Sequence, residues 1–146
     1  MNMESGMSLV ELMAILAIAG LALSATGLYL APAAAPLETA THVVEGFFRE
    51  ARLRAIATTS AYRVRPSGPY QITSEYANSC SDTTWTASDT PDIDLKNGVS
   101  MPDTSWSVCF SSRGISSGNV ILTLSHSDFG TRQIEVLLGG TTRVLP

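Results

Sequence analysis

The residues able to do chemistry are few and lie far apart in the sequence. His42 and His126 are the only histidines, and neither belongs to an H-E-x-x-H or H-x-x-x-H pattern that would hold a metal ion. Asp92 and Asp94 could bind a cation, but a solvated acidic loop is the favoured interpretation. Asp128 begins an Asp-Phe-Gly triplet in a chain too short for a kinase, and the serines form no G-x-S-x-G turn. The sequence therefore predicts no enzyme, no metal site and no cofactor.

Length and composition narrow the class of protein. The chain has 146 residues, which is room for one domain. Hydrophobic residues make up 45%, charged residues only 15%, and the mean hydropathy is +0.17. This composition excludes a disordered chain, which would be poor in apolar residues and rich in charge. The net charge of -4 and the pI of about 5.0 argue against a general nucleic-acid-binding protein, which is usually basic.

The most apolar part of the chain lies near its start. Residues 12–31 contain no charged side chain. As a helix rising about 1.5 Å per residue, this segment is long enough for the roughly 30 Å of a bilayer's hydrocarbon core. A small domain has too little protein to bury a helix that is apolar on every side. The segment is therefore interpreted as a membrane segment or as the apolar part of a signal sequence.

The residues that flank this segment help to distinguish a membrane segment from a signal sequence. Residues 1–11 contain no Lys or Arg, although a secretory signal peptide normally begins with basic residues. A small-residue site before Pro36 leaves cleavage after Ala35 as an alternative. Glu11 directly adjoins the apolar segment, where an ionised carboxylate is costly unless it has a partner. Glu11 is therefore predicted to be functional.

Residues 6–13, Gly-Met-Ser-Leu-Val-Glu-Leu-Met, resemble the leader of type IV prepilins and type II secretion pseudopilins. The resemblance implies that a prepilin peptidase cuts after Gly6, that the new amine of Met7 is methylated, and that Glu11 is the fifth residue of the mature chain. Glu11 would then pair with the terminal amine of a neighbouring subunit during assembly. The implied organisation is a leader over residues 1–6, a transmembrane and assembly helix over 7–36, and a globular head over 37–146.

Within the head, residues 37–58 have the spacing of an amphipathic helix. Its start is expected to be capped by Thr39 or Thr41. A helix that packs on a sheet is favoured over a partner-binding stripe. The predicted apolar stripe consists of Ala40, Val44, Phe47, Ala51 and Ala55, widened by Val43, Phe48 and Ile56. The opposite face, interpreted as solvated surface, carries Glu45, Arg49, Glu50, Arg52 and Arg54.

After residue 60 the chain changes to short β-rich runs separated by Gly, Pro, Ser, Asn and Asp. Gly139-Gly140 predicts a tight hairpin between the last two strands. Residues 78–104 are predicted to form a long loop, held to the sheet by Trp85 and Trp106. The predicted strands cover residues 61–65, 70–76, 107–111, 120–125, 132–138 and 142–145.

Two segments narrow the resemblance to the GspH/FimT group of minor pilins. Residues 44–56, VEGFFREARLRAI, are similar to a helix of that group, and residues 109–114, CFSSRG, resemble the end of one of its strands. The resemblance implies an α+β, pilin-like fold in which a long N-terminal helix, with its first half in the membrane, packs on an antiparallel β-sheet head. A head in the oxidising periplasm would allow Cys80 and Cys109 to form a disulfide worth about 3–4 kcal/mol, with two separate thiols as the alternative.

Three functions follow as hypotheses. The first is a structural minor subunit of a type IV pilus or a type II secretion pseudopilus, single-pass in the bacterial inner membrane. Its partners would be the peptidase and methyltransferase, other subunits, the inner-membrane assembly platform and lipid. The second is DNA capture for natural transformation, in which Arg113, Arg132 and Arg143 would contact phosphates. The third is a secreted soluble protein with a cleaved signal peptide.

Overall fold

The computed structural model describes residues 9–18 and 35–145, and the chain divides into two units, Met1–Ala33 and Ala34–Pro146. In the first unit, residues 9–18 are helical. None of the helices in the described ranges combines the length and the apolar character needed to cross a membrane. The predicted membrane segment, residues 12–31, lies outside the described residues from position 19 onward, as do Gly6 and Met7. The predicted boundaries after residues 6 and 36 stay predictions.

The head begins with α2, Pro36–Thr58, within one residue of the predicted helix. Proline at the first helical position lacks only an N–H that would have no partner inside the helix. The predicted threonine cap is wrong: the N-cap residue is Ala35, which has no side-chain acceptor. Thr41 lies inside the helix, and its hydroxyl donates to the carbonyl of Leu37 at 2.7 Å. The helix ends at Thr58, and its C-cap residue Thr59 has a left-handed φ of 54°.

The buried side of α2 is narrower than predicted. Val43 and Ile56, which were expected to widen the apolar stripe, are 48% and 46% exposed. Both are exposed and lie at the margin of the stripe that faces the sheets. The buried positions of the helix are Leu37, Thr41, Val44, Phe47, Phe48, Ala51 and Ala55.

The first sheet is antiparallel and has the strand order β3-β2-β1-β5, with β4 also paired to β2. Three of its strands confirm the sequence prediction with small changes of boundary, namely β1 (Ala61–Gly68), β2 (Gln71–Ala77) and β5 (Val108–Phe110). The other two, β3 (Thr86–Ala87) and β4 (Ile93–Asp94), lie inside the predicted long loop. That loop also buries Leu95, Val99 and Met101, so it contributes to the core of the head.

The second sheet has the order β6-β7-β8 and is also antiparallel. Its strands are β6 (Val120–His126), β7 (Gly130–Val136) and β8 (Thr142–Leu145). The predicted Gly-Gly hairpin joins β7 to β8. In it the Gly140 N–H donates to the carbonyl of Leu137 at 2.7 Å, and Gly140 has a φ of +77°.

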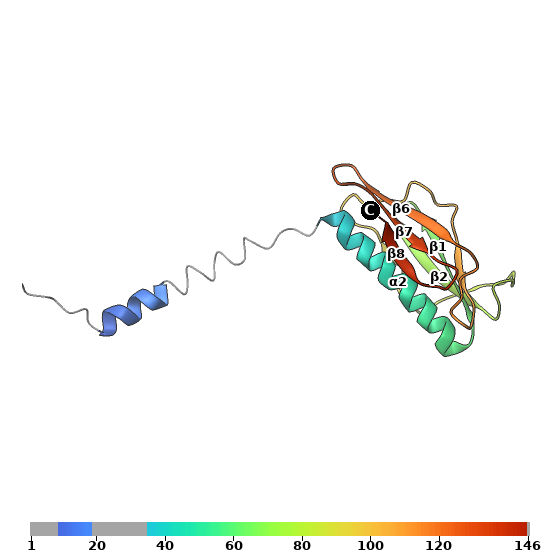
Figure 1. Cartoon of the computed structure of the whole chain (residues 1–146), viewed down its shortest axis with the longest axis horizontal. Coiled ribbons are helices and arrows are strands. Elements are labelled where there is room, and N and C mark those ends of the chain that lie inside the picture. The colour runs from blue at the N-terminus through green and yellow to red at the C-terminus, as the bar shows by residue number, and fades with distance from the viewer. Residues whose placement is uncertain (1–8, 19–34, 146) are drawn as a thin grey trace, which may run out of the picture. The chain divides into compact units, whose positions relative to one another are not determined.

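The two sheets share one core, which α2 covers. The helix contacts β1, β4 and β5 of the first sheet and all three strands of the second, and Figure 1 shows it along one side of the strands. In this core the Phe48 ring of α2 lies 5.8 Å from the ring of Trp106 and 6.5 Å from that of Phe110. The head is therefore α+β, with one helix on antiparallel sheets, as the resemblance implied.

Candidate functional site

Three segments of the chain that are far apart in sequence meet at Arg52 of α2. The Arg52 Nε–H donates to the carbonyl of Gly114, in the loop after β5, at 3.0 Å. Gly140, in the β7–β8 turn, approaches both: a Cβ added there would overlap the Gly114 carbonyl oxygen and lie 2.9 Å from Arg52 Nε. Arg52, Gly114 and Gly140 are called the Arg52 junction below.

Both glycines of the junction are required by backbone conformation and by space. Their φ angles are +72° at Gly114 and +77° at Gly140, a region that L side chains rarely adopt. A Cβ on Gly114 would also lie 2.7 Å from Cδ1 of Ile56. The same two loops are joined by a hydrogen bond from the Ser116 N–H to the Leu138 carbonyl at 3.1 Å. The junction therefore ties the end of the first sheet and the last turn of the second sheet to α2.

A hollow of about 130 Å³ lies beside the junction. Glu45 of α2 stands near it, accepting from the Thr142 hydroxyl and from an Arg49 terminal nitrogen, each at 3.4 Å. The side chains that line the hollow offer hydrogen-bond donors and positive charge. The hollow is lined by Arg49, Arg52, Gly140, Thr141 and Thr142.

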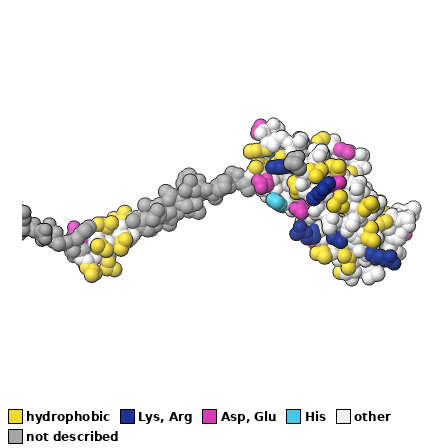
Figure 2. All heavy atoms as spheres, viewed as in Figure 1, with side chains coloured by type: hydrophobic (Ala, Val, Ile, Leu, Met, Phe, Trp, Pro, Cys, Tyr) yellow, Lys and Arg dark blue, Asp and Glu magenta, His cyan; other side chains and the backbone are white. Residues whose placement is uncertain are grey.

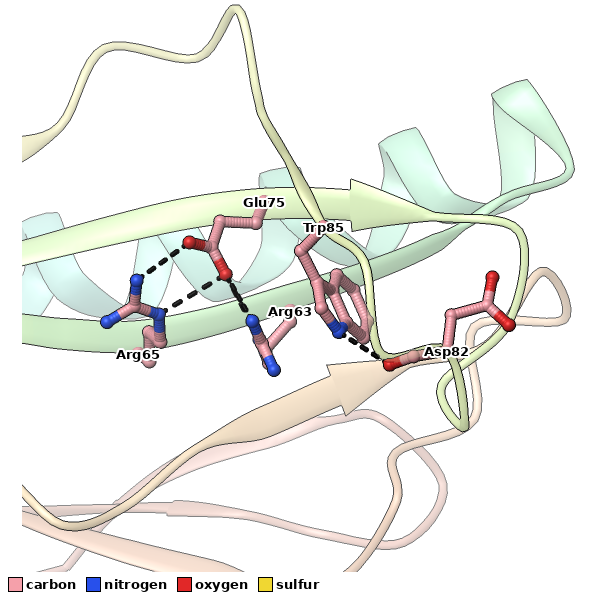
Figure 3. Close-up of polar contacts among 5 residues, drawn as sticks. All are labelled: Arg63, Arg65, Glu75, Asp82 and Trp85. Carbon is pink, nitrogen blue, oxygen red and sulfur yellow. Dashed lines mark hydrogen bonds and ion pairs between the residues drawn. The ribbon is translucent and has the colours of Figure 1, made fainter.

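A second polar cluster lies on the first sheet, where Glu75 of β2 accepts from Arg63 and Arg65 of β1 (Figure 3). An Arg65 terminal nitrogen is 2.7 Å from Oε1 of Glu75, and Arg63 Nε is 3.1 Å from Oε2. Hydrogen bonding from Arg65 lowers the pKa of Glu75 to about 2; burial opposes this shift and Arg63 adds to it. Glu75 therefore remains ionised at any physiological pH and holds the two arginines together.

The loop between β2 and β3 is fastened over the same part of the sheet. The Arg63 guanidinium lies 4.1 Å from the centre of the Trp85 ring, and the Trp85 indole N–H donates to the carbonyl of Asp82 at 2.9 Å (Figure 3). Cys80 of this loop forms a disulfide with Cys109 of β5, which confirms the predicted pair. The loop is therefore held to the sheet by one covalent bond and one cation–π contact.

The residues predicted for processing and assembly lie in the first unit. Gly6 and Met7 are outside the described residues. Glu11 lies on the helix formed by residues 9–18 and is exposed. The roles predicted for these three residues therefore stay predictions.

The three arginines predicted to contact DNA have separate surroundings. Arg113 is exposed in the loop after β5. Arg132 lies on the same face of β7 as the buried Ile134, two residues later, and lines a hollow beside the first turns of α2. Arg143 donates to Glu135, which lies on the opposite face of β7 because successive residues of a strand alternate between its two faces. No contact among the described residues joins any two of the three arginines.

The histidines and paired aspartates have local roles. Nδ1 of His42 is 3.9 Å from Glu45 on the surface of α2. Nδ1 of His126 accepts from the Asp128 N–H at 3.0 Å. Asp94 accepts from Gln71 at 3.1 Å across the β2–β4 pair. Within residues 9–18 and 35–145 the structure contains no cluster of three or more His, Cys, Asp and Glu that could hold a metal ion.

Arg52 is the functional candidate for which the sequence prediction was wrong. It was assigned to the solvated face of the helix, whereas it is half-buried and bonded to Gly114. A signal was present, because Arg52 follows the buried Phe48 by four residues and precedes the buried Ala55 by three. That spacing places it on the core side of the helix.

Comparisons with known proteins identify the fold of the head. No protein-family model matches the sequence, and no curated protein matches it. Among solved structures, the chain is similar to the type IV minor pilin FimU of Pseudomonas aeruginosa (TM-score 0.59, 11% identity, 75% of this chain and 88% of that one). It is also similar to the minor pseudopilin EpsH of the Vibrio cholerae type 2 secretion system (TM-score 0.59, 14% identity, 76% and 97%). The fold is therefore that of a minor pilin or pseudopilin head.

Proposed function

We propose that the chain is a minor pilin or pseudopilin, a structural subunit of a type IV pilus or a type II secretion pseudopilus. One observation supports this most strongly: a head with the fold of FimU and EpsH follows a charge-free apolar segment in the same chain. The leader pattern at residues 6–13 supplies the processing step, in which cleavage after Gly6 is followed by methylation of Met7. The protein acts as a building unit rather than as an enzyme.

In this proposal the apolar segment anchors the subunit and the head projects from the membrane. The apolar residues 12–31 hold the subunit in the inner membrane, and the head is in the periplasm, where the Cys80–Cys109 disulfide is stable. The partners are the prepilin peptidase and methyltransferase, other pilin or pseudopilin subunits, the inner-membrane assembly platform and lipid.

Glu11 sets the register of assembly in this proposal. A carboxylate at the edge of the hydrocarbon core is costly, and pairing with a cation lowers that cost. After cleavage, the methylated amine of Met7 on a neighbouring subunit is such a cation. A subunit is then stabilised at one axial position along the filament, where its Glu11 meets that amine.

The first test is the intact mass and N-terminal peptide of the full chain, co-expressed with a prepilin peptidase. We expect a chain that starts at Met7 with one N-methyl group. A start after Ala35 would instead identify a secreted soluble protein, and an uncut chain would identify a simple membrane-anchored one. A Gly6→Val variant is the control, because its bulkier residue should block cleavage by the prepilin peptidase and leave signal-peptide cleavage after Ala35 unaffected.

The second test concerns Glu11 directly. Glu11→Gln should leave membrane insertion unchanged and reduce incorporation into filaments, measured as the fraction of the subunit that is recovered with sheared filaments. Glu4→Gln removes a carboxylate from the leader, which is absent from the mature chain, and should have no effect. Equal incorporation of the two variants would contradict the role given to Glu11.

A further inference from the structure

Arg52 is a half-buried guanidinium without a carboxylate partner among the described residues. Five other arginines form ion pairs there: Arg49 with Glu45, Arg54 with Glu50, Arg63 and Arg65 with Glu75, and Arg143 with Glu135. Arg52 instead donates its Nε–H to the Gly114 carbonyl, which fixes the direction of the guanidinium plane. Its two terminal nitrogens have no partner in the described part of the chain. A guanidinium held in this way is pre-oriented for an anion.

The hollow beside Arg52 adds further donors. The Leu137 N–H donates to the Thr141 carbonyl at 2.9 Å, so residues 137 and 141 face each other in the turn, one position beyond the paired Val136 of β7 and Thr142 of β8. In an antiparallel ladder the next residue, Thr142, then directs its backbone N–H away from β7. Thr141 also lines the hollow, together with Arg49 and Arg52. Figure 2 shows Lys and Arg side chains gathered over the middle and C-terminal part of α2.

Two exposed aliphatic side chains lie beside the junction. Ile56, 46% exposed, is a residue that a Cβ on Gly114 would touch. Ile115, next to Gly114, is 50% exposed. A charged donor beside exposed aliphatic groups is typical of the centre of a protein–protein interface, where the aliphatic groups exclude water from the polar contact.

We propose that this hollow binds the carboxylate of an Asp or Glu side chain presented by a neighbouring subunit; the inference rests on the proposed function, which supplies the neighbour. A carboxylate matches the two terminal nitrogens of a guanidinium and fits a volume of about 130 Å³. Glu45, beside the hollow, adds negative charge that disfavours a row of phosphates more than a single carboxylate. The aliphatic side chains have no counterpart on a nucleic-acid backbone, so a protein is the favoured partner.

The first experiment measures binding of the carboxylate group by itself. The full chain, in detergent micelles, is titrated with sodium acetate against sodium chloride at equal ionic strength, and amide and arginine Hε signals are followed by NMR. We expect saturable, acetate-specific shifts at Arg52, Thr141 and Thr142, with an affinity at least threefold weaker in Thr141→Val. This variant leaves the Arg52–Gly114 bond in place. Arg132→Gln, which removes another arginine without a carboxylate partner, should bind acetate as the wild type does. Shifts that are absent, or equal in acetate and chloride, would overturn the proposal.

The second experiment identifies the source of the carboxylate. A photocrosslinking amino acid at position 138, in the turn next to the hollow, is introduced into cells that assemble the filament. We expect a crosslink to another subunit that is lost in Arg52→Gln and kept in Arg132→Gln. A crosslink that is unaffected by Arg52→Gln would overturn the proposal. So would duplex DNA that shifts the same NMR signals with steep salt dependence.

The two proposals fail in different ways. A chain that is not cut after Gly6 refutes the proposed function whatever the acetate titration gives. A chain that is cut and methylated normally, but shows no acetate-specific shift at Arg52, refutes the carboxylate site alone.

Discussion

Replacing Gly140 by alanine tests the Arg52 junction most directly, because the turn has no room for a Cβ. At a φ of +77° an alanine costs about 1–2 kcal/mol in backbone energy. The Cβ would overlap the Gly114 carbonyl oxygen, which is backbone and cannot turn aside. Opening the turn enough to admit the Cβ breaks the Arg52–Gly114 hydrogen bond, which is worth about 1.5–3 kcal/mol because its donor is charged. We expect the free energy of unfolding to fall by about 2.5–5 kcal/mol.

Gly139 provides the matched control for this prediction. It precedes Gly140 in the same turn, its φ is not positive, and a Cβ there would meet no atom within 4 Å. Gly139→Ala should therefore change stability by less than about 0.5 kcal/mol. Both variants are unfolded thermally as full chains in mild detergent, with tryptophan fluorescence reporting on the buried Trp106. A drop in Tm of about 10 °C or more is expected for Gly140→Ala, at roughly 4 °C per kcal/mol. Equal Tm values for the two variants would refute the reasoning.

Two further predictions concern the first sheet. Replacing both Cys80 and Cys109 by alanine should lower the free energy of unfolding by about 3–4 kcal/mol, because the disulfide closes a loop with a sequence separation of 29. A reducing agent should lower the free energy of unfolding of the wild type by a similar amount and leave that of the double variant unchanged. Because the pKa of Glu75 is lowered from 4.5 to about 2 on folding, its ionised form stabilises the head above pH 4.5. Solvent screening of the partly exposed arginines reduces this contribution to on the order of 1 kcal/mol, and it is lost as the pH falls from 4.5 to 2. Glu75→Gln should flatten the dependence of unfolding free energy on pH in that range, whereas Glu50→Gln, on the exposed side of α2, should retain it; a flat wild-type profile would contradict the Glu75 assignment.

The fold was predictable wherever the side-chain pattern is local. The period of α2 and the alternation in β1, β2 and β6 mark these elements without reference to the rest of the chain. The short strands β3 and β4 have two residues each, too few to show an alternation of apolar and polar side chains in the sequence. They exist because the chain between β2 and β5 folds back on β2, as in the hydrogen bond from the Leu95 N–H to the Tyr70 carbonyl at 2.7 Å. Contacts of this kind depend on the whole fold.

The candidate site was predictable in its parts but not as a site. Gly140 was recognised as a turn residue, and Gly114 was part of a segment that supported the family resemblance. That both approach Arg52 depends on how two loops from different sheets pack against one helix, and no pattern within either loop specifies it. An arginine at almost any position on a helix can also place its guanidinium in solvent, because its side chain is long enough to extend past its neighbours. The burial of Arg52 is therefore determined by its neighbours.

The distribution of charge in the chain bears on which ligand the hollow selects. Residues 78–107 contain five aspartates and one lysine, so they account for the whole formal net charge of -4, and the rest of the chain is balanced with eight acidic and eight basic residues. Fixed charges act over about 8–10 Å at physiological ionic strength, a shorter distance than the diameter of a domain of this size. The acidic pI therefore describes the segment between β2 and β5 rather than α2 or the β7–β8 turn. At the Arg52 junction, Arg49, Arg52 and Glu45 determine the local charge, and a site with one uncompensated guanidinium suits one carboxylate better than a chain of phosphates.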